Sequence, residues 1–223
     1  MIDVQQADLL LTTTRSVRKR LDFDRPVPLE LIEECLEVAL QAPTGSNQQG
    51  WHFLVIDDPA KKAALADIYQ RAMTIYAQMR GEAPTPVHAT AEEDPRAASL
   101  PGVVDSALYL TLNFARVPVF VLACVEGRAE SDGPLLQASL YGSILPAAWS
   151  FMLAARARGL GSAWTTLHLM FEEESRALLG IPDHVTQGAL IPVGYYLGET
   201  FRPAPRLPVR SVASYNAWAQ PLP

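Results

Sequence analysis

The chain has 223 residues, of which 49% are hydrophobic, and carries a formal net charge of −6 with a pI near 5.2. This length and composition can bury a large core, and one compact domain over residues 1–223 is expected. The acidic balance argues against non-specific nucleic-acid binding and against adhesion to an acidic membrane surface, so neither partner is expected.

The sequence favours a reducing compartment. Its two cysteines, Cys35 and Cys124, each lie in an apolar pattern, so small buried hydrophobes are expected there and not a disulfide framework. The N-terminus lacks the basic start, apolar core and small-residue cleavage site of a signal peptide. A cytoplasmic protein is therefore expected.

The first predicted element is a helix over residues 3–21, with Asp3 as its N-cap and apolar residues at helical spacing. It ends in a basic cluster. Arg15 and Arg18 are three residues apart, so on a helix they would share a face and converge on one anion, with Ser16 adding a hydroxyl. The alternative is a solvated basic helix end that the helix dipole favours.

A second helix is predicted over residues 29–41, and Pro43 ends it because a residue before proline disfavours helical angles. The loop that follows is polar and uncharged, and it leads into a strand predicted over residues 51–56. Its donors and acceptors are Thr44, Ser46, Asn47, Gln48 and Gln49. Such neutral groups suit the edge of a heterocycle better than a metal ion or a nucleic-acid backbone, whereas the alternative is a capped helix end with a polar turn.

A third helix is predicted over residues 59–80. Residues 81–101 are rich in Pro, Ala and Glu without periodicity, and we interpret them as a mobile excursion that either covers a site or forms a surface loop. A helix over residues 103–114 then leads into residues 117–125, whose β-branched run is typical of a strand buried on both faces.

Residues 133–155 carry no charge over nearly the length needed to span a bilayer. The segment contains Gln137, several serines and Pro146, and two arginines follow it. A helix buried inside a soluble protein is therefore expected, because helices that are apolar on all sides also occur in large cores and at subunit interfaces.

The last predicted elements are a strand over residues 162–167, a helix over residues 171–179 and a strand over residues 185–197. Strands that alternate with helices indicate one sheet wrapped by helices. Residues 199–223 form a proline-punctuated tail with Arg202, Arg206 and Arg210. Bulky aromatic residues in this tail, Tyr215 and Trp218, favour docking onto another subunit.

The sequence lacks the motifs that identify several enzyme classes. No Gly-x-x-x-x-Gly-Lys-Ser/Thr loop and no Gly-x-Ser-x-Gly elbow occur. The four histidines show no metal-ligand spacing, so no metal is expected. A polar loop and two arginine-bearing segments at opposite ends of the chain remain, and they suit an organic cofactor with a phosphate.

Over nearly its whole length the sequence resembles the nitroreductase family of FMN-dependent oxidoreductases. The matching motifs are Arg15-Ser16-Val17-Arg18, Ala42-Pro43-Thr44-Gly45-Ser46-Asn47 with Gln49 and Trp51, Gly159-Leu160-Gly161, and Arg206. The resemblance implies an α/β (α+β) three-layer sandwich whose central mixed sheet is wrapped by helices. It also implies an intertwined homodimer with two FMN sites at its interface.

By this resemblance, Arg15, Ser16, Val17 and Arg18 would approach the FMN phosphate and the polar side of the flavin, and Arg206 would complete the phosphate site. Pro43, Thr44, Ser46 and Asn47 would lie beside the cofactor, across the dimer interface. The stretch Trp164-Thr165-Thr166-Leu167 would pass flavin N5 and offer it a main-chain N–H. No catalytic side chain is expected, because the flavin carries the redox chemistry.

The expected function is FMN-dependent oxidoreduction with NAD(P)H, by a ping-pong mechanism, of nitroaromatics, quinones or related small oxidants. Thr14 stands where many family members have arginine, Gly50 where many have proline, and Leu167 where several have glycine. The pattern Trp164-Thr165-Thr166 is closer to the deiodinase-like branch. Alternatives are a flavin-dependent reductive dehalogenase, a flavin-fragmenting enzyme, a flavin-binding protein without turnover, and a domain that has lost FMN.

Overall fold

The structure is a computed structural model that describes residues 2–79 and 95–223. Within these residues four strands form one sheet in the order β1-β2-β4-β3, and each neighbouring pair is antiparallel. The strands are β1 (Trp51–Ile56), β2 (Val119–Glu126), β3 (Leu160–Ser162) and β4 (Val185–Tyr195). Isolated parallel bridges join Ser16 to Ser162 and Gly127 to Val185, so the pairing is mixed.

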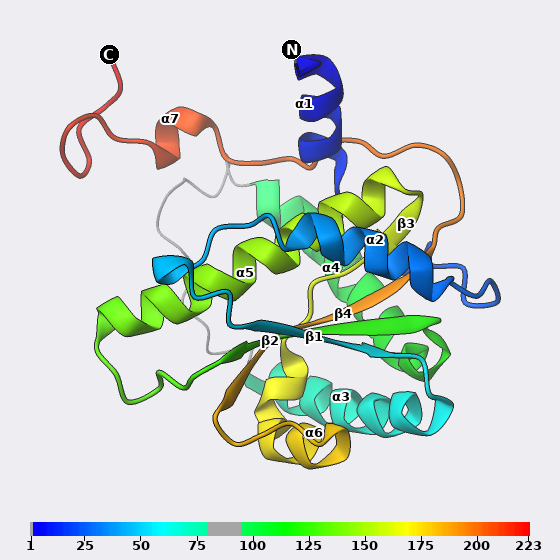
Figure 1. Cartoon of the computed structure of the whole chain (residues 1–223). Coiled ribbons are helices and arrows are strands. Elements are labelled where there is room, and N and C mark those ends of the chain that lie inside the picture. The colour runs from blue at the N-terminus through cyan, green and yellow to red at the C-terminus, as the bar shows by residue number, and fades with distance from the viewer. Residues whose placement is uncertain (1, 80–94) are drawn as a thin grey trace.

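Helices cover both faces of the sheet (Figure 1). One face carries α2 (Leu29–Ala39) and α5 (Pro134–Ala157), and the other carries α3 (Pro59–Met79) and α6 (Glu172–Leu179). The other α-helices of the described residues are α1 (Val4–Thr13), α4 (Pro95–Leu112) and α7 (Val209–Val212). The three-layer sandwich predicted from the sequence is confirmed.

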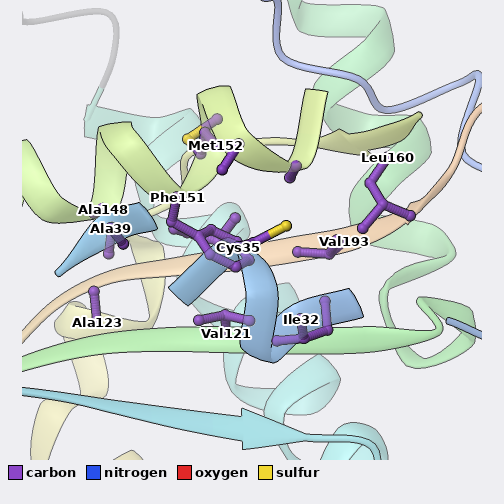
Figure 2. Close-up of a cluster of buried hydrophobic side chains, with 14 of the residues drawn as sticks. Ile32, Cys35, Ala39, Val121, Ala123, Ala148, Phe151, Met152, Leu160 and Val193 are labelled. Atoms are coloured by element: carbon purple, nitrogen blue, oxygen red, sulfur yellow. The ribbon is translucent and has the colours of Figure 1, made fainter. Parts of the chain in front are cut away.

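Strand β2 contributes to the core on both of its faces, because successive side chains of a strand point to opposite sides. Val121 and Ala123 face the layer of α2 and α5, where Figure 2 shows them beneath Cys35 and Phe151. Phe120, Leu122 and Cys124 face the layer of α3 and α6. Residues 119–125 are buried throughout, which confirms the predicted two-sided burial. Both cysteines are buried and free.

Helix α5 is the uncharged segment of the sequence, and its two sides differ. By length and composition alone it could cross a membrane, but 44% of its most apolar window is buried inside the protein. Ile144, Phe151 and Met152 pack into the core. Leu135 and Trp149 remain exposed, at 81% and 39%. The predicted buried helix is therefore buried on one side and leaves an apolar side uncovered.

The first helix is shorter than predicted. Helix α1 ends at Thr13, and Thr14 already has extended angles (φ −67°, ψ 118°). The hydroxyls of Thr13 and Thr14 donate to the carbonyls of Leu9 and Leu10 at 2.5 and 2.6 Å, and such bonds compete with the helical backbone. The prediction that the two arginines after Thr14 share a helical face is therefore wrong.

Two further predictions are corrected. Residues 95–101 of the predicted excursion belong to α4, which begins at Pro95, where a missing N–H costs nothing; residues 81–94 lie outside the described residues. The strand predicted over residues 162–167 is wrong in extent, because β3 ends at Ser162 and a 3-10 helix, η3 (Leu167–Phe171), follows. The other predicted elements are found with ends shifted by a few residues.

Candidate functional site

Beyond β3 the chain leaves part of a sheet edge unpaired. Ala163 N and Thr165 N donate to Pro192 O and Leu190 O of β4, at 3.3 and 3.2 Å. Alternate peptide groups of an extended chain point to opposite sides, so the N–H groups of Trp164 and Thr166 point away from β4. Within the described residues neither group donates a hydrogen bond. Two neutral donors are therefore available along this edge.

The Arg15-Ser16-Val17-Arg18 segment runs along the same edge. Ser16 forms a parallel bridge with Ser162, and Val17 N donates to Ser162 O at 2.8 Å. Val17 is only 4% exposed and packs against Gly161, where an added Cβ would lie 2.9 Å from the valine Cβ. The valine thus anchors the segment, and an arginine lies on either side of it.

A cavity of about 290 Å³ opens beside this segment. Its lining residues are Arg15, Ser16, Val17, Arg18, Lys19, Arg20, Ser106, Thr200, Phe201 and Arg202. Five of them are cationic and none is acidic. Lys19 forms an ion pair with Asp105, but among the described residues no carboxylate pairs with Arg15, Arg18 or Arg202. Unpaired guanidinium groups gathered in one cavity favour an anionic ligand.

Arg18 is the most enclosed of these unpaired cations. It is half-buried, its Nη1 donates to Ser106 Oγ at 3.4 Å, and burial lowers the pKa of its guanidinium. Removing a charge from water without a partner costs free energy. An acceptor bound next to Arg18 would offset part of that cost.

The tail is joined to the cavity through Phe201. Two guanidinium groups contact this ring, with Arg20 Cζ at 4.4 Å and Arg156 Cζ at 4.1 Å from its centroid. Cations over aromatic faces are attracted by the ring quadrupole. Just beyond the ring, Arg15 Nη1 donates to the carbonyl of Arg202 at 3.0 Å. Residues from the N-terminal and C-terminal parts of the chain therefore form one wall of the cavity.

Arg206 lies further along the tail and does not line the cavity. It is exposed, and its Nη1 donates to Pro205 O at 3.2 Å. Arg202 lines the cavity instead, together with Ser106 of α4, which sequence reasoning missed. A proline-punctuated tail has no periodicity that would indicate which of its arginines faces inward.

The polar loop between α2 and β1 lies against α5. Gly45 N donates to Ser143 Oγ at 2.9 Å, and an added Cβ at Gly45 would collide with Ser139 Oγ. Three non-glycine residues take left-handed angles, with φ of 49° at Ser46, 54° at Asn47 and 53° at Gln49. Such strained backbone persists only where surrounding contacts enforce it, and it is concentrated at functional sites.

This loop is not part of the arginine cavity of its own chain. Thr44 Oγ1 and Asn47 Oδ1 both accept hydrogen bonds from Gln49, each at 3.1 Å. Ser46 lines a separate cavity of about 670 Å³ next to the first turns of α5, and Pro43 borders an apolar groove of about 540 Å³. The structure therefore pairs the Arg15–Arg18 segment with Ser162, just before Trp164–Thr166, although none of these last three residues lines the arginine cavity, and it keeps the polar loop apart from both.

The donor set fits a flavin mononucleotide. A phosphate dianion matches converging guanidinium groups, and the neutral N–H groups of Trp164 and Thr166 match the heteroatoms along an isoalloxazine edge. Among the described residues no cluster of three or more His, Cys, Asp or Glu side chains could hold a metal ion.

Known proteins share this arrangement of elements. The family model "Nitroreductase family" matches residues 11–195. The NADH dehydrogenase of Thermus thermophilus is 30% identical over 230 residues, 97% of each chain. Iodotyrosine deiodinase 1 of Rattus norvegicus is 29% identical over 188 residues, 83% of this chain and 60% of that one. The crystal structure of an FMN and NADPH-dependent nitroreductase from sphigopyxis sp. strain HMH superposes with a TM-score of 0.67 at 22% identity, covering 97% and 100% of the two chains. The chain belongs to the nitroreductase family.

Proposed function

We propose that this protein is an FMN-dependent oxidoreductase that uses NAD(P)H to reduce nitroaromatics, quinones or related small oxidants. One observation carries the proposal. The segment that bears the unpaired Arg15 and Arg18 pairs with β3, and the chain just after β3 has two available N–H donors. FMN would supply the redox chemistry when bound, and the protein would bind and orient it. No side chain is needed as a general acid or base.

The site residues divide between the two ends of the cofactor. Arg15, Ser16 and Arg18 would hold the phosphate and the polar side of the flavin. Arg202 supports this wall, and the exposed Arg206 would reach the phosphate from the tail. The Thr166 N–H would bond flavin N5, with Trp164, Thr165 and Leu167 alongside.

We also propose an intertwined homodimer in which the polar loop approaches the cofactor of the other subunit. Exposed apolar residues on α1 and α5, among them Leu9, Leu135 and Trp149, need a cover, because apolar patches of this kind are uncommon on monomers. Trp218 of the tail is 87% exposed and is suited to docking. A solution mass equal to the single chain's 24.4 kDa would contradict the dimer.

The proposal also includes the domain organisation of the chain and the cellular location of the protein. Residues 1–223 would act as one nitroreductase-like domain of a soluble, cytoplasmic protein. Two buried free thiols are consistent with a reducing compartment. Export of the protein from cells that express it with its native N-terminus would contradict this location.

NAD(P)H is expected to bleach the flavin absorbance of the purified protein under anaerobic conditions, at about one equivalent per bound FMN. NAD(P)H would deliver two electrons and a proton as hydride and leave as NAD(P)+. The oxidant would then bind in the same space: a nitro group takes two electrons and two protons to become nitroso and water, and a quinone becomes a hydroquinone.

One shared space implies ping-pong kinetics, so double-reciprocal plots are expected to be parallel. Intersecting lines would contradict the shared site. Persistent flavin colour with NADH and with NADPH would favour a binding protein without turnover. A colourless protein that does not retain added FMN would refute the cofactor assignment.

Reductive dehalogenation is the second candidate. It is favoured by the rat iodotyrosine deiodinase relative and by the Trp164-Thr165-Thr166 pattern. In this reaction two electrons and a proton replace a carbon–iodine bond by carbon–hydrogen and release iodide. Assays of the reduced protein with 3-iodotyrosine and with a nitroaromatic in parallel would separate the two, since only one of them releases iodide.

Replacing Arg18, Arg202 or Arg206 with alanine is expected to weaken FMN binding by about 1.5 to 3 kcal/mol for each charge-assisted hydrogen bond lost. Equilibrium dialysis against FMN measures the effect. Arg116→Ala is the matched control, because Arg116 is an exposed arginine that belongs neither to the Arg15–Arg18 segment nor to the tail. Unchanged retention in any one variant removes that residue from the site.

A further inference from the structure

Arg20 lines the arginine cavity, but its donors are directed into the protein chain. Its Nε donates to Leu197 O at 2.6 Å and its Nη1 donates to Thr200 O at 2.9 Å, across 177 and 180 residues of sequence. The main-chain carbonyl of Arg20 accepts from Leu197 N at 2.8 Å. Two charge-assisted bonds and one backbone bond therefore fasten the 197–200 loop, which follows β4, to this arginine.

The third nitrogen of the guanidinium is enclosed. Arg20 Nη2 is buried and has no hydrogen-bond partner among the described residues. It lies against Gly198, where an added Cβ would be 2.9 Å away and where the backbone is left-handed, with φ of 81°. A nitrogen shielded in this way cannot reach an anion in the cavity. The main partner of Arg20 is therefore the 197–200 loop and not a ligand.

Aromatic rings close the two ends of the 197–200 loop on each other. Phe201, just after the loop, meets Tyr196, just before it, with ring centroids 4.8 Å apart and planes at 86°. Aromatic pairs prefer this edge-to-face arrangement. Tyr196 is also held from α5, because Arg156 Nη1 donates to its hydroxyl at 2.7 Å. The ring of Phe201 is therefore held in place both by Arg20 and by Tyr196.

The tail arginine of the cavity comes directly after this ring. Arg202 lines the cavity, and its carbonyl accepts from Arg15 Nη1 at 3.0 Å. Among the described residues Arg202 makes no other hydrogen bond. The position of Arg202 therefore depends on the loop that precedes it.

We propose that Arg20 is a positioning residue for the phosphate end of the flavin site. By fastening the 197–200 loop it holds Arg202 in the wall of the cavity, where the carbonyl of Arg202 in turn orients Arg15. The inference rests on the proposed function, because it takes the phosphate of FMN as the anion at that wall. Arg20 acts through the geometry of its hydrogen bonds and need not touch the cofactor.

Arg20→Lys and Gly198→Ala disturb this contact from opposite sides. The lysine keeps the positive charge but has one nitrogen in place of a rigid planar fork. The alanine leaves Arg20 intact and pushes the loop away from it, because the new Cβ meets Nη2 and strains the left-handed backbone. Gly180→Ala is the matched control, because its φ of 69° gives the same kind of strain but its added Cβ meets nothing within 4 Å.

Amide hydrogen exchange of residues 196–202 in flavin-free protein reports on the loop itself. We expect faster exchange in this segment for Arg20→Lys and for Gly198→Ala than for the wild type, because a loop that is held less firmly opens more often. Gly180→Ala should exchange there at the wild-type rate. Unchanged exchange in Arg20→Lys would overturn the inference without reference to any cofactor.

The affinities for FMN and for riboflavin, which lacks the phosphate, show whether the loop serves the phosphate wall. For Arg20→Lys and for Gly198→Ala we expect the dissociation constant of FMN to rise about tenfold, as for one lost charge-assisted hydrogen bond, and that of riboflavin to stay unchanged. The double variant should bind FMN no more weakly than either single variant, because both changes remove the same contact.

Equal losses of FMN and riboflavin affinity would indicate general damage to the fold and would overturn the inference. A loss in Arg20→Lys with none in Gly198→Ala would also overturn it, since Arg20 would then contact the phosphate directly. The reverse pattern would show that the fork of Arg20 is not needed and would overturn it as well. Each of these outcomes leaves the proposed function intact, whereas a wild-type protein that does not bind FMN would overturn both.

Discussion

Gly161→Ala is expected to raise the dissociation constant of FMN by more than about 100-fold, through the loss of two or more charge-assisted contacts. The added Cβ would lie 2.9 Å from both Cβ and Cγ1 of Val17 and 3.1 Å from Cγ2. Val17 cannot rotate away, because its branched Cβ is itself in the clash and its N–H is bonded to Ser162 O. The segment must move as a whole, and Arg15 and Arg18 move with it.

The same overpacking should lower the free energy of unfolding by about 1 to 3 kcal/mol. The flavin absorbance of purified protein, followed by dialysis against FMN, measures retention. Gly102→Ala is the control, because an added Cβ on this residue of α4 meets nothing within 4 Å. A Gly161→Ala protein with the full flavin spectrum would show that the arginine segment does not hold the cofactor.

Acidification from pH 7 to pH 5 is expected to lower the free energy of unfolding by about 2 kcal/mol through His168 alone. This residue of η3 is 0% exposed, and among the described residues neither of its ring nitrogens has a hydrogen-bond partner. Burial lowers the pKa of His168 to about 4, although the nearby carboxylate of Glu172 acts in the opposite direction. The folded protein therefore holds the ring neutral.

The sign follows from the unfolded chain, in which histidine has its ordinary pKa of about 6.5. Below that pH the unfolded state binds a proton that the folded state rejects, so stability falls as the pH drops from about 6.5 towards 4. Above about pH 7 the residue contributes no pH dependence.

Urea unfolding at several pH values, with the wild type and His168→Leu, checks this prediction. The leucine variant should lose the slope that His168 contributes, which is about half a proton at pH 6.5 and nearly one at pH 5. At pH 7 it should be no less stable, since the imidazole has no partners to lose. His184→Gln, at an exposed histidine, is the matched control. A His168→Leu protein with unchanged pH dependence would place the acid-sensitive group elsewhere.

The sequence by itself determined the layers of this protein. The apolar run of β2 predicts a strand buried on both sides, and Pro43 predicts the end of α2, because strand alternation and proline geometry act within a few residues of chain. The motif Arg15-Ser16-Val17-Arg18 can be identified in the sequence for the same reason, because its charged and polar side chains are neighbours in the chain. Signals that act within a few adjacent residues can be interpreted without knowledge of the tertiary contacts.

Only the tertiary structure decided how these parts make a site. Arg15 and Arg18 lie on a sheet edge and not on a helix because Ser16 pairs with Ser162, and no local pattern encodes a pairing over that separation. Arg202 lines the cavity because Arg15 reaches its carbonyl across 187 residues of chain. The available N–H of Thr166 likewise exists because β4 binds only the alternate peptide groups. Each of these facts depends on contacts between distant segments, whose energies are settled only when the whole core packs.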